Sequence, residues 1–308
     1  MVSNRANRSE AAWRVQLRVT LARSCGCYDP RQPSNRPATS ACPLVENIDP
    51  GTDQVLVARD GAVITLTFNR PEARNAMTWG MYERLYDACE EVDADESIRV
   101  LVLKGAGGKA FVAGTDIAQF AQFKSGEDGL RYERESERYL GRIGRVKKPV
   151  IAQIQGFAVG GGFGIAAGAD VRIATPDSSF GVPIARTLGN CLSMRAYASF
   201  VDILGASRLK EMMLTARLLG AEEALGAGFV HHIVDADKIE DHVRELAQRV
   251  ATHAPITMWV TKESVRRIQE ARALPDGDDL VVATYGSADF REGVRAFVDK
   301  RPPRWTGS

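Results

Sequence analysis

The chain reads Phe111-Val112-Ala113-Gly114-Thr115-Asp116 at one point and Gly160-Gly161-Gly162-Phe163-Gly164 further on. Each stretch follows a strand-like run and opens a helix-like segment. Glycines at such junctions let the backbone approach a ligand closely and leave free N–H groups pointing at it. Two N–H groups aimed at one point form an oxyanion hole, which stabilises negative charge on a carbonyl oxygen. We therefore predict an anion-stabilising site built from these two loops.

The sequence on either side of the loops predicts an α/β fold. Residues 55–59 and 62–68 alternate around Asp60-Gly61, which is typical of a tight hairpin. Thr78 is a good N-cap for a helix with one apolar face, made of Met81, Leu85, Ala88 and Val92. The apolar runs 100–103, 150–154 and 171–174 are typical of strands covered on both faces.

The chain after Leu192 has a different pattern. It is helical in character, with breaks near Gly205, Gly220 and Gly228. We therefore expect sheet-forming units followed by a helical tail.

Bulk composition excludes several classes of protein. The 308 residues are 44% hydrophobic with a net charge of +1, so a sizeable core is expected and a nucleic-acid-binding footprint is not. No apolar run approaches the roughly 18 residues of a membrane span. The five cysteines are odd in number and lack metal-ligand spacing with histidine, which favours a reducing, cytoplasmic location and no metal site.

Residues 1–50 differ from the rest. They contain seven arginines, clusters of Pro and Ser, and almost no acid before Glu46. We favour a disordered N-terminal extension, or translated sequence upstream of the true start, because the segment has no long apolar helical face. An Arg-rich transit peptide is the alternative.

Several segments resemble the enoyl-CoA hydratase/isomerase (crotonase) superfamily. These are the two loops, 69–77 (NRPEARNAM), 147–152 (KKPVIA) and 291–301 (REGVRAFVDKR), within a resemblance that runs from about residue 53 to 305. It implies a crotonase-like spiral of ββα units with a C-terminal helical oligomerisation region. The implied divisions are an acyl-CoA-binding core at 51–250 and helices at 251–308, and the implied assembly is a homotrimer or hexamer.

The resemblance also assigns site residues. The backbone N–H groups of Thr115 and Gly161 would hold the carbonyl oxygen of an acyl-CoA thioester. Coenzyme A would enter as part of the substrate, with no separate cofactor, and its binding positions would be Ala73, Arg74, Ala113, Asp116, Ile117 and Gly162. Phe297 and Lys300 would approach the nucleotide from the C-terminal helices, sometimes those of a neighbouring subunit. The alternative is a solvated helix face with Phe297 in the core.

Two positions depart from the family pattern. A hydratase of this family uses two glutamates, and the corresponding residues here are Gly164 and Ile184. Neither side chain can move a proton, so hydration or isomerisation by the usual residues is doubtful. We still expect a lyase or isomerase of carboxylic-acid or fatty-acid metabolism.

Three explanations stay open. Another acid could substitute, and the candidates are Glu127, Asp128, Tyr132, Glu133, Glu135, Glu137 and Tyr139, whereas Asp116 is expected to cap its helix. The reaction could instead be thioester hydrolysis or decarboxylation, with Arg186 attracting the substrate carboxylate. Lastly, the chain could bind acyl-CoA without turning it over. His231 and His232 are expected to be structural.

Overall fold

Two largely parallel sheets organise residues 54–308, the part of the chain that this computed structural model describes. The six-stranded sheet has the order β1-β2-β3-β5-β7-β10 and the four-stranded sheet the order β4-β6-β8-β9. The first sheet comprises β1 Val55–Asp60, β2 Val63–Phe68, β3 Val100–Gly105, β5 Val150–Ile154, β7 Val171–Ala174 and β10 His232–Ile233. The second comprises β4 Ala110–Val112, β6 Phe157–Val159, β8 Ser179–Gly181 and β9 Leu219–Gly220. The predicted extension, residues 1–50, lies outside the described residues.

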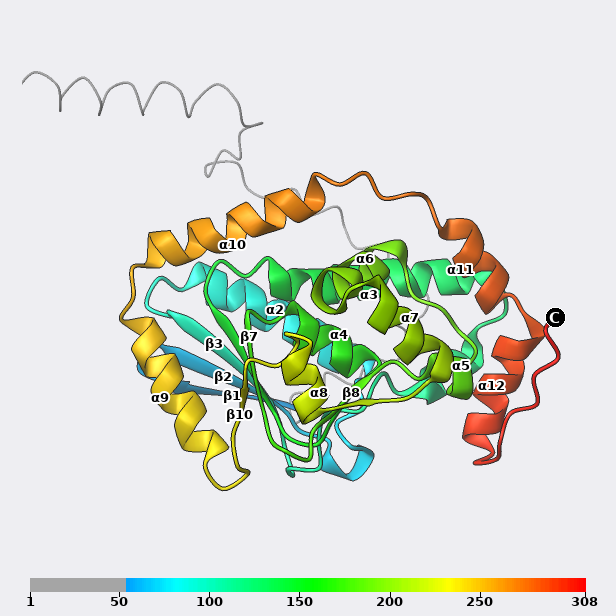
Figure 1. Ribbon diagram of the computed structural model, residues 1–308, viewed down its shortest axis with the longest axis horizontal. Helices are drawn as coiled ribbons and strands as arrows, with labels where there is room; N and C mark the ends of the chain where they lie inside the picture. Colours follow the sequence, from blue (N-terminus) through cyan, green and yellow to red (C-terminus); the bar gives the residue numbers. More distant parts are fainter. Residues whose placement is uncertain (1–53) are drawn as a thin grey trace, which may run out of the picture. The chain divides into compact units, whose positions relative to one another are not determined.

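Helices connect and cover the sheets (Figure 1). The 3₁₀ helices are η1 Pro71–Ala73 and η2 Ile117–Gln122. The α-helices that follow strands of the core are α2 Trp79–Ala94, α3 Gly126–Gly144, α4 Gly161–Gly168, α5 Ile184–Thr187, α6 Met194–Leu204, α7 Ala206–Thr215 and α8 Ala221–Gly226. The last four are α9 Ile239–Ala251, α10 Pro255–Glu270, α11 Asp278–Tyr285 and α12 Ala288–Val298.

Successive strands enter the two sheets alternately. The strands β3, β5 and β7 join the large sheet, and the strand after each of them joins the small one before a helix follows. This repeat of two strands and a helix confirms the predicted spiral of ββα units. The predicted hairpin is also confirmed, since β1 and β2 pair antiparallel with Asp60 opposite Val63.

The large sheet is covered on both faces, as its apolar strands predicted. On β3, Val100 and Val102 pack against α9, whereas Leu101 and Leu103 belong to the main core with α2. Thr78 caps α2 by accepting a hydrogen bond from the N–H of Met81, as expected. Both predicted apolar faces are therefore real, because a strand alternates its side chains between two layers.

The C-terminal helices are present, but the chain after Leu192 is not wholly helical. The two-residue strands β9 and β10 interrupt it, pairing with β8 and β7. Two residues are too few to show a period in the sequence, so these strands escaped prediction. Residues 54–308 belong to one compact unit, so the change at residue 250 is one of architecture within that unit.

The helix α3 is the element on which α11 packs. An aromatic and aliphatic cluster joins it to η2, α11 and α12, with members Phe120, Phe123, Leu130, Tyr285 and Phe290. In contrast, α10 has no buried residue and extends along one edge of the described unit (Figure 1).

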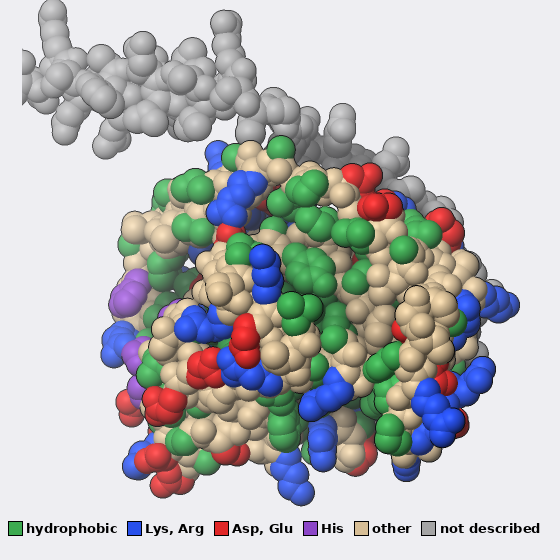
Figure 2. Space-filling view, turned by 45° about the vertical axis from the view of Figure 1, so that its right-hand side comes forward, with side chains coloured by type: hydrophobic (Ala, Val, Ile, Leu, Met, Phe, Trp, Pro, Cys, Tyr) green, Lys and Arg blue, Asp and Glu red, His purple; other side chains and the backbone are tan. Residues whose placement is uncertain are grey.

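The surface and the helices carry no sign of a membrane segment. None of the helices within residues 54–308 combines the length and apolar character needed to cross a bilayer. On the face drawn in Figure 2, basic side chains are interspersed with acidic ones.

The contact between α3 and α11 yields a stability prediction. A Cβ added to Gly129 would collide with the Tyr285 ring, whereas one added to Gly141 of the same helix would meet only the Arg145 guanidinium at 3.8 Å. We expect Gly129→Ala to destabilise the protein by about 1–3 kcal/mol, because a packed interior resists overpacking. Gly141→Ala should be neutral or stabilise by up to about 1 kcal/mol through helix propensity. Urea unfolding of both variants checks this, and equal effects would contradict the tight contact.

Candidate active site

The two glycine loops lie against each other. A Cβ on Gly160 would lie 3.5 Å from the Cα of Gly114, and one on Gly114 would lie 3.6 Å from the Val159 carbonyl oxygen. A Cβ on Gly162 would collide with the Val112 carbonyl oxygen. Gly160 has a φ of 56°, which favours glycine. The two predicted loops therefore lie together because Gly162 leaves no room for a side chain, and because Gly114 and Gly160 adopt positive φ angles that favour glycine.

The N–H groups predicted to form the oxyanion hole are free. Within residues 54–308, no acceptor is bonded to the N–H of Thr115 or of Gly161, and both residues are half-buried. Gly161 begins α4, so its N–H is one of the unpaired donors of a helix start. A Cβ on Gly161 would lie 3.3 Å from the Thr115 hydroxyl oxygen, so the two donors are neighbours.

Flanking hydrogen bonds turn the Thr115 N–H outward. Met77 donates to the Gly114 carbonyl at 2.8 Å, and Asp116 donates to the Met77 carbonyl at 2.9 Å. These two hydrogen bonds form a short parallel β-bridge between Met77 and Thr115, and they use backbone groups of the residues on either side of Thr115. The N–H of Thr115 therefore points away from Met77. The buried side chain of Asn75 holds the same region by donating to the carbonyls of Ala106 and Ala110 at 3.0 and 2.7 Å.

The structure brings together most of the residues predicted for coenzyme A. Ala113 donates to the Arg74 carbonyl at 3.1 Å, which places the loop after β4 beside η1, where Ala73 lies. Arg74 is exposed and its guanidinium lies 5.7 Å from the centre of the Phe157 ring. Asp116 caps η2 through the Ala118 N–H, as expected, so Ile117 begins that helix.

Three other predicted residues lie on the surface. Phe297 is 52% exposed on α12, so it is not in the core, and Lys300 follows it, also exposed. Because α12 packs on η2 through Phe290 and Phe120, this surface adjoins the segment after Asp116. Arg186 is exposed on α5 and does not line the cavity described next.

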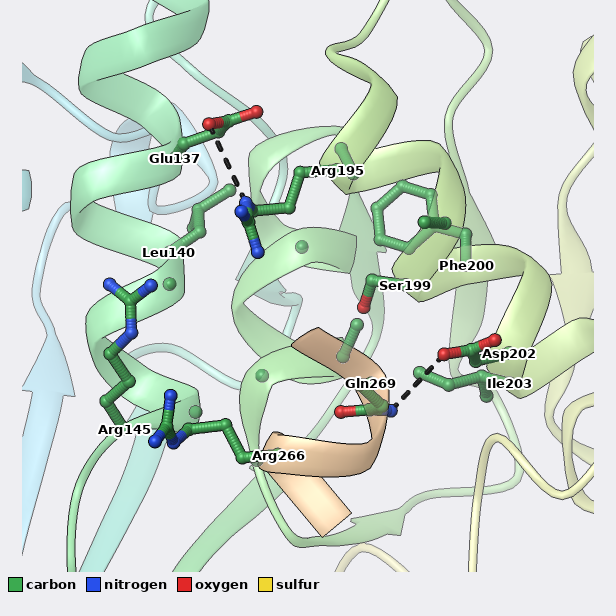
Figure 3. A pocket seen from close by; sticks show the side chains of 18 of the residues that line it. Glu137, Leu140, Arg145, Arg195, Ser199, Phe200, Asp202, Ile203, Arg266 and Gln269 are labelled. Atoms are coloured by element: carbon green, nitrogen blue, oxygen red, sulfur yellow. Dashed lines mark hydrogen bonds and ion pairs between the residues drawn. The ribbon is translucent and has the colours of Figure 1, made fainter. Parts of the chain in front are cut away.

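A cavity of about 710 Å³ lies beside the two donors, between α3, α4, α6 and α10. Gly160 and Gly161 line it, together with Tyr82 and Tyr132. Figure 3 shows part of its wall, with Arg195 of α6 directed at Glu137 of α3. In the same view, Gln269 of α10 is directed at Asp202 of α6, which is one of the few polar contacts that hold α10 over the cavity.

Three hydroxyl groups meet at the oxyanion loop. The Thr115 hydroxyl lies 3.0 Å from that of Tyr82 and 3.2 Å from that of Tyr132. A Cβ on Gly161 would collide with the Tyr82 hydroxyl, so this group lies beside the second donor as well. Burial raises the pKa of Tyr82 to about 12 and that of Tyr132 further, so both stay neutral hydrogen-bonding groups.

Gly164 and Ile184 are the two positions that the family resemblance led us to expect in place of the hydratase glutamates. Gly164 lines the cavity, and a Cβ there would lie 2.9 Å from Leu140 of α3. Ile184 packs against the main core at the start of α5. The helices α3 and α4 therefore approach closely where a longer side chain would otherwise stand.

Most of the candidate acids on α3 have structural roles. Asp128 forms a capping box with Ser125 and an ion pair with Arg131. Glu127 is exposed. Glu135 forms an ion pair with Arg138, and Glu137 forms one with Arg195. The Tyr139 hydroxyl donates to Glu83.

Glu133 differs from these acids. Its side chain lines the cavity, is 5% exposed, and has no ion-pair partner within residues 54–308. It accepts hydrogen bonds from the Tyr285 hydroxyl at 2.7 Å and the Ser193 N–H at 2.8 Å. Burial raises the pKa of Glu133 to about 7, because the charged form loses its water. A carboxyl group with such a pKa can accept and release protons near neutrality.

Sequence reasoning missed Tyr82, Tyr285 and Ser193. Tyr82 lies on the predicted buried face of α2, where a hydroxyl gives no periodic signal. Tyr285 and Ser193 reach Glu133 across 152 and 60 residues, a relation that no local pattern reveals. His231 is structural as expected, since its ring nitrogen accepts from the Arg172 N–H at 3.0 Å.

The described residues, 54–308, contain no group of three or more His, Cys, Asp or Glu side chains placed to hold a metal ion. The site is thus made of backbone donors, hydroxyl groups and one buried carboxyl.

Comparison with known proteins identifies relatives. The family model described as enoyl-CoA hydratase/isomerase matches residues 58–308. A short-chain-enoyl-CoA hydratase of Clostridium acetobutylicum is 29% identical, covering 81% of this chain and 96% of its own. A carnitinyl-CoA dehydratase of Escherichia coli is 32% identical, covering 83% of this chain and 99% of its own. Among solved structures, a methylmalonyl-CoA decarboxylase in complex with 2-nitronate-propionyl-CoA has a TM-score of 0.76 and is 27% identical. The match covers 83% of this chain and 99% of the decarboxylase chain.

The raised pKa of Glu133 predicts a pH-dependent stability. The folded protein holds the proton more tightly than the unfolded chain, so this residue contributes stability below its ordinary pKa of 4.5 and loses it as the pH rises through about 7. The loss should total roughly 3 kcal/mol. Urea unfolding across this range should show wild type losing stability relative to Glu133→Gln, which cannot ionise. A constant difference between the two proteins would show that Glu133 is not perturbed.

Proposed function

Because the chain belongs to the enoyl-CoA hydratase/isomerase family, we propose that it converts an acyl-CoA thioester through an enolate held by the N–H groups of Thr115 and Gly161. The observation that carries this proposal is the pair of unbonded N–H groups, on adjoining loops at the edge of the cavity. An enolate places its charge on the thioester oxygen, where preorganised donors are most effective. The start of α4 adds a favourable dipole for the same charge.

The wall of the cavity favours an acyl group. Leu140, Phe200 and Ile203 line it together with glycine and alanine positions of α4, so apolar chain could pack there. The thioester would then lie at the Gly160–Gly161 end. Coenzyme A would leave along the surface formed by Arg74, Ala113 and Asp116. Two of the decarboxylase neighbours are complexes with coenzyme A derivatives, 2-nitronate-propionyl-CoA and 2S-carboxypropyl CoA.

Decarboxylation is the second candidate reaction. The decarboxylase structures are among the similar folds, with TM-scores of 0.73–0.76. Loss of carbon dioxide from a malonyl-type thioester also leaves an enolate, and it needs no carboxylate at Gly164 or Ile184. The exposed position of Arg186 gives it no contact with the cavity, so this reaction would depend on the oxyanion hole alone.

Assembly is a further part of the proposal. We infer that copies of the chain associate through their C-terminal helices as trimers or hexamers. Support comes from apolar side chains that α10 exposes, since Ile256 is 73% and Ile268 68% accessible. Analytical ultracentrifugation should give three or six times the 33.6 kDa chain mass. A monomer at micromolar concentration would contradict the assembly.

Removing one donor tests the enolate proposal. Thr115→Pro deletes the N–H, whereas Thr115→Ala keeps it and removes the side-chain hydroxyl and methyl group. With crotonyl-CoA, methylmalonyl-CoA and butyryl-CoA as substrates, we expect Thr115→Pro to lower kcat at least 100-fold in whichever reaction the wild type performs. Thr115→Ala should stay within about 10-fold.

A second pair of variants guards against misfolding of the loop. In a Tyr82→Phe background, which removes the hydroxyl that a Cβ on Gly161 would strike, Gly161→Pro lacks the N–H and Gly161→Ala keeps it. Equal activity within each folded pair would refute the oxyanion hole. Binding of acyl-CoA with no covalent change in any of the three substrates would identify a non-catalytic binding protein instead.

A further inference from the structure

We propose that Glu133 is the catalytic residue that transfers a proton to and from the α-carbon of the bound acyl thioester. This inference rests on the proposed function, because it needs an enolate to protonate. Glu133 would supply the proton transfer that the side chains of Gly164 and Ile184 cannot. It lies on α3, whereas Gly164 lies on α4 and Ile184 on α5.

The position of Glu133 on α3 directs it at the cavity. It belongs to a helical stripe with Glu137, Leu140 and Gly144, spaced by three or four residues, and all four line the cavity. Leu140 in this stripe faces Gly164 of α4, the helix whose first residue is the Gly161 donor. Glu133 and that donor are therefore on facing walls of one space.

The chemical environment of Glu133 is unlike that of a structural carboxylate. Glu137, one turn along the same helix, pairs with Arg195 at 3.9 Å, and Arg134 pairs with Asp278 at 2.8 Å. Glu133 has only the neutral donors Tyr285 and Ser193. A buried carboxyl without a counter-charge is costly to the fold, which points to a chemical use.

The hydrogen bonds of Glu133 can serve both of its protonation states. When Glu133 is charged, Tyr285 donates to it and accepts from the Asn190 side-chain N–H at 3.2 Å. The Asn190 side-chain oxygen is buried and has no partner within residues 54–308. If the amide turns over, this oxygen accepts from Tyr285, which then accepts from protonated Glu133. A site that satisfies both states favours reversible proton transfer.

Other titratable groups surround Glu133. They are Tyr82 on α2, Tyr132 and Glu137 on α3, Cys191 before α6, Tyr197 on α6, and Tyr285 on α11. Burial is the main cause that raises the pKa of Glu133 to about 7, and Glu137 adds to it. Each of these phenols and the thiol has a raised pKa, so none competes as a base near neutrality.

The step balances without a co-reactant. The Glu133 carboxylate accepts a proton from the α-carbon, the C–H electron pair becomes the enolate, and the two N–H donors hold the resulting oxyanion. The reverse step returns the proton and forms the C–H bond. In deuterium oxide the same cycle exchanges the α-hydrogens of a saturated acyl-CoA without net reaction.

Deuterium exchange into butyryl-CoA, followed by proton NMR with the full-length protein, tests the assignment. We expect the wild type to exchange the α-hydrogens and Glu133→Gln to slow this at least 100-fold, within the range of general base catalysis. Glu135→Gln, a matched control on the same helix whose side chain pairs with Arg138 and does not line the cavity, should stay within about 3-fold. The exchange rate of the wild type should rise with pH and level off above about 7.

A positioning variant separates catalysis from structure. Tyr285→Phe removes a donor to the charged carboxylate, so the inflection of the rate–pH profile should move to higher pH, whereas Glu137→Gln should not raise it. Rapid exchange in Glu133→Gln with loss in Thr115→Pro would overturn the role of Glu133 and leave the enolate proposal standing. Absence of exchange in wild type that binds butyryl-CoA would also overturn it. Undiminished exchange in folded Thr115→Pro would instead refute the oxyanion hole.

Discussion

The close approach of two backbone loops is the constraint on which the site depends. Gly114 and Gly160 lie side by side with positive φ angles that favour glycine, and Gly162 lies so close to the carbonyl of Val112 that a side chain would collide with it. Each loop ends a strand of the small sheet, so the parallel pairing of β4 with β6 sets their spacing. Two donors are thereby fixed in place before any ligand arrives, which is how a protein stabilises developing charge without reorganising.

The helix α3 connects this anion site to the rest of the protein. Its Leu140 fills the space above Gly164, its Tyr132 reaches the Thr115 hydroxyl, and its Gly129 lets the Tyr285 ring come close. One helix therefore shapes the cavity, touches the oxyanion loop and carries the buried carboxyl. The acid proposed above, Glu133, lies on this helix, whereas Gly164 lies on α4 and Ile184 on α5.

Much of the fold, and the two glycine loops that adjoin in it, could be predicted from the sequence. Strand alternation, the Thr78 cap and the two glycine loops are local signals, and each has a local physical cause. The short strands β9 and β10 had no such signal. Among the seven candidate residues of 127–139, no local pattern singles out Glu133, because its burial depends on α6 and α11. Phe297 and Arg186 resemble functional positions, but only the folded chain shows that both are exposed.

The bond between Tyr285 and Glu133 joins residues 152 positions apart. Contacts of such long range form late, because the entropy of a large loop must be lost before the contact is made. The helices α3 and α4 can therefore form before the Tyr285 hydroxyl reaches the Glu133 carboxyl. A chain that lacked α11 would lack Tyr285, so the Ser193 N–H would be left as the donor to the buried Glu133 carboxyl.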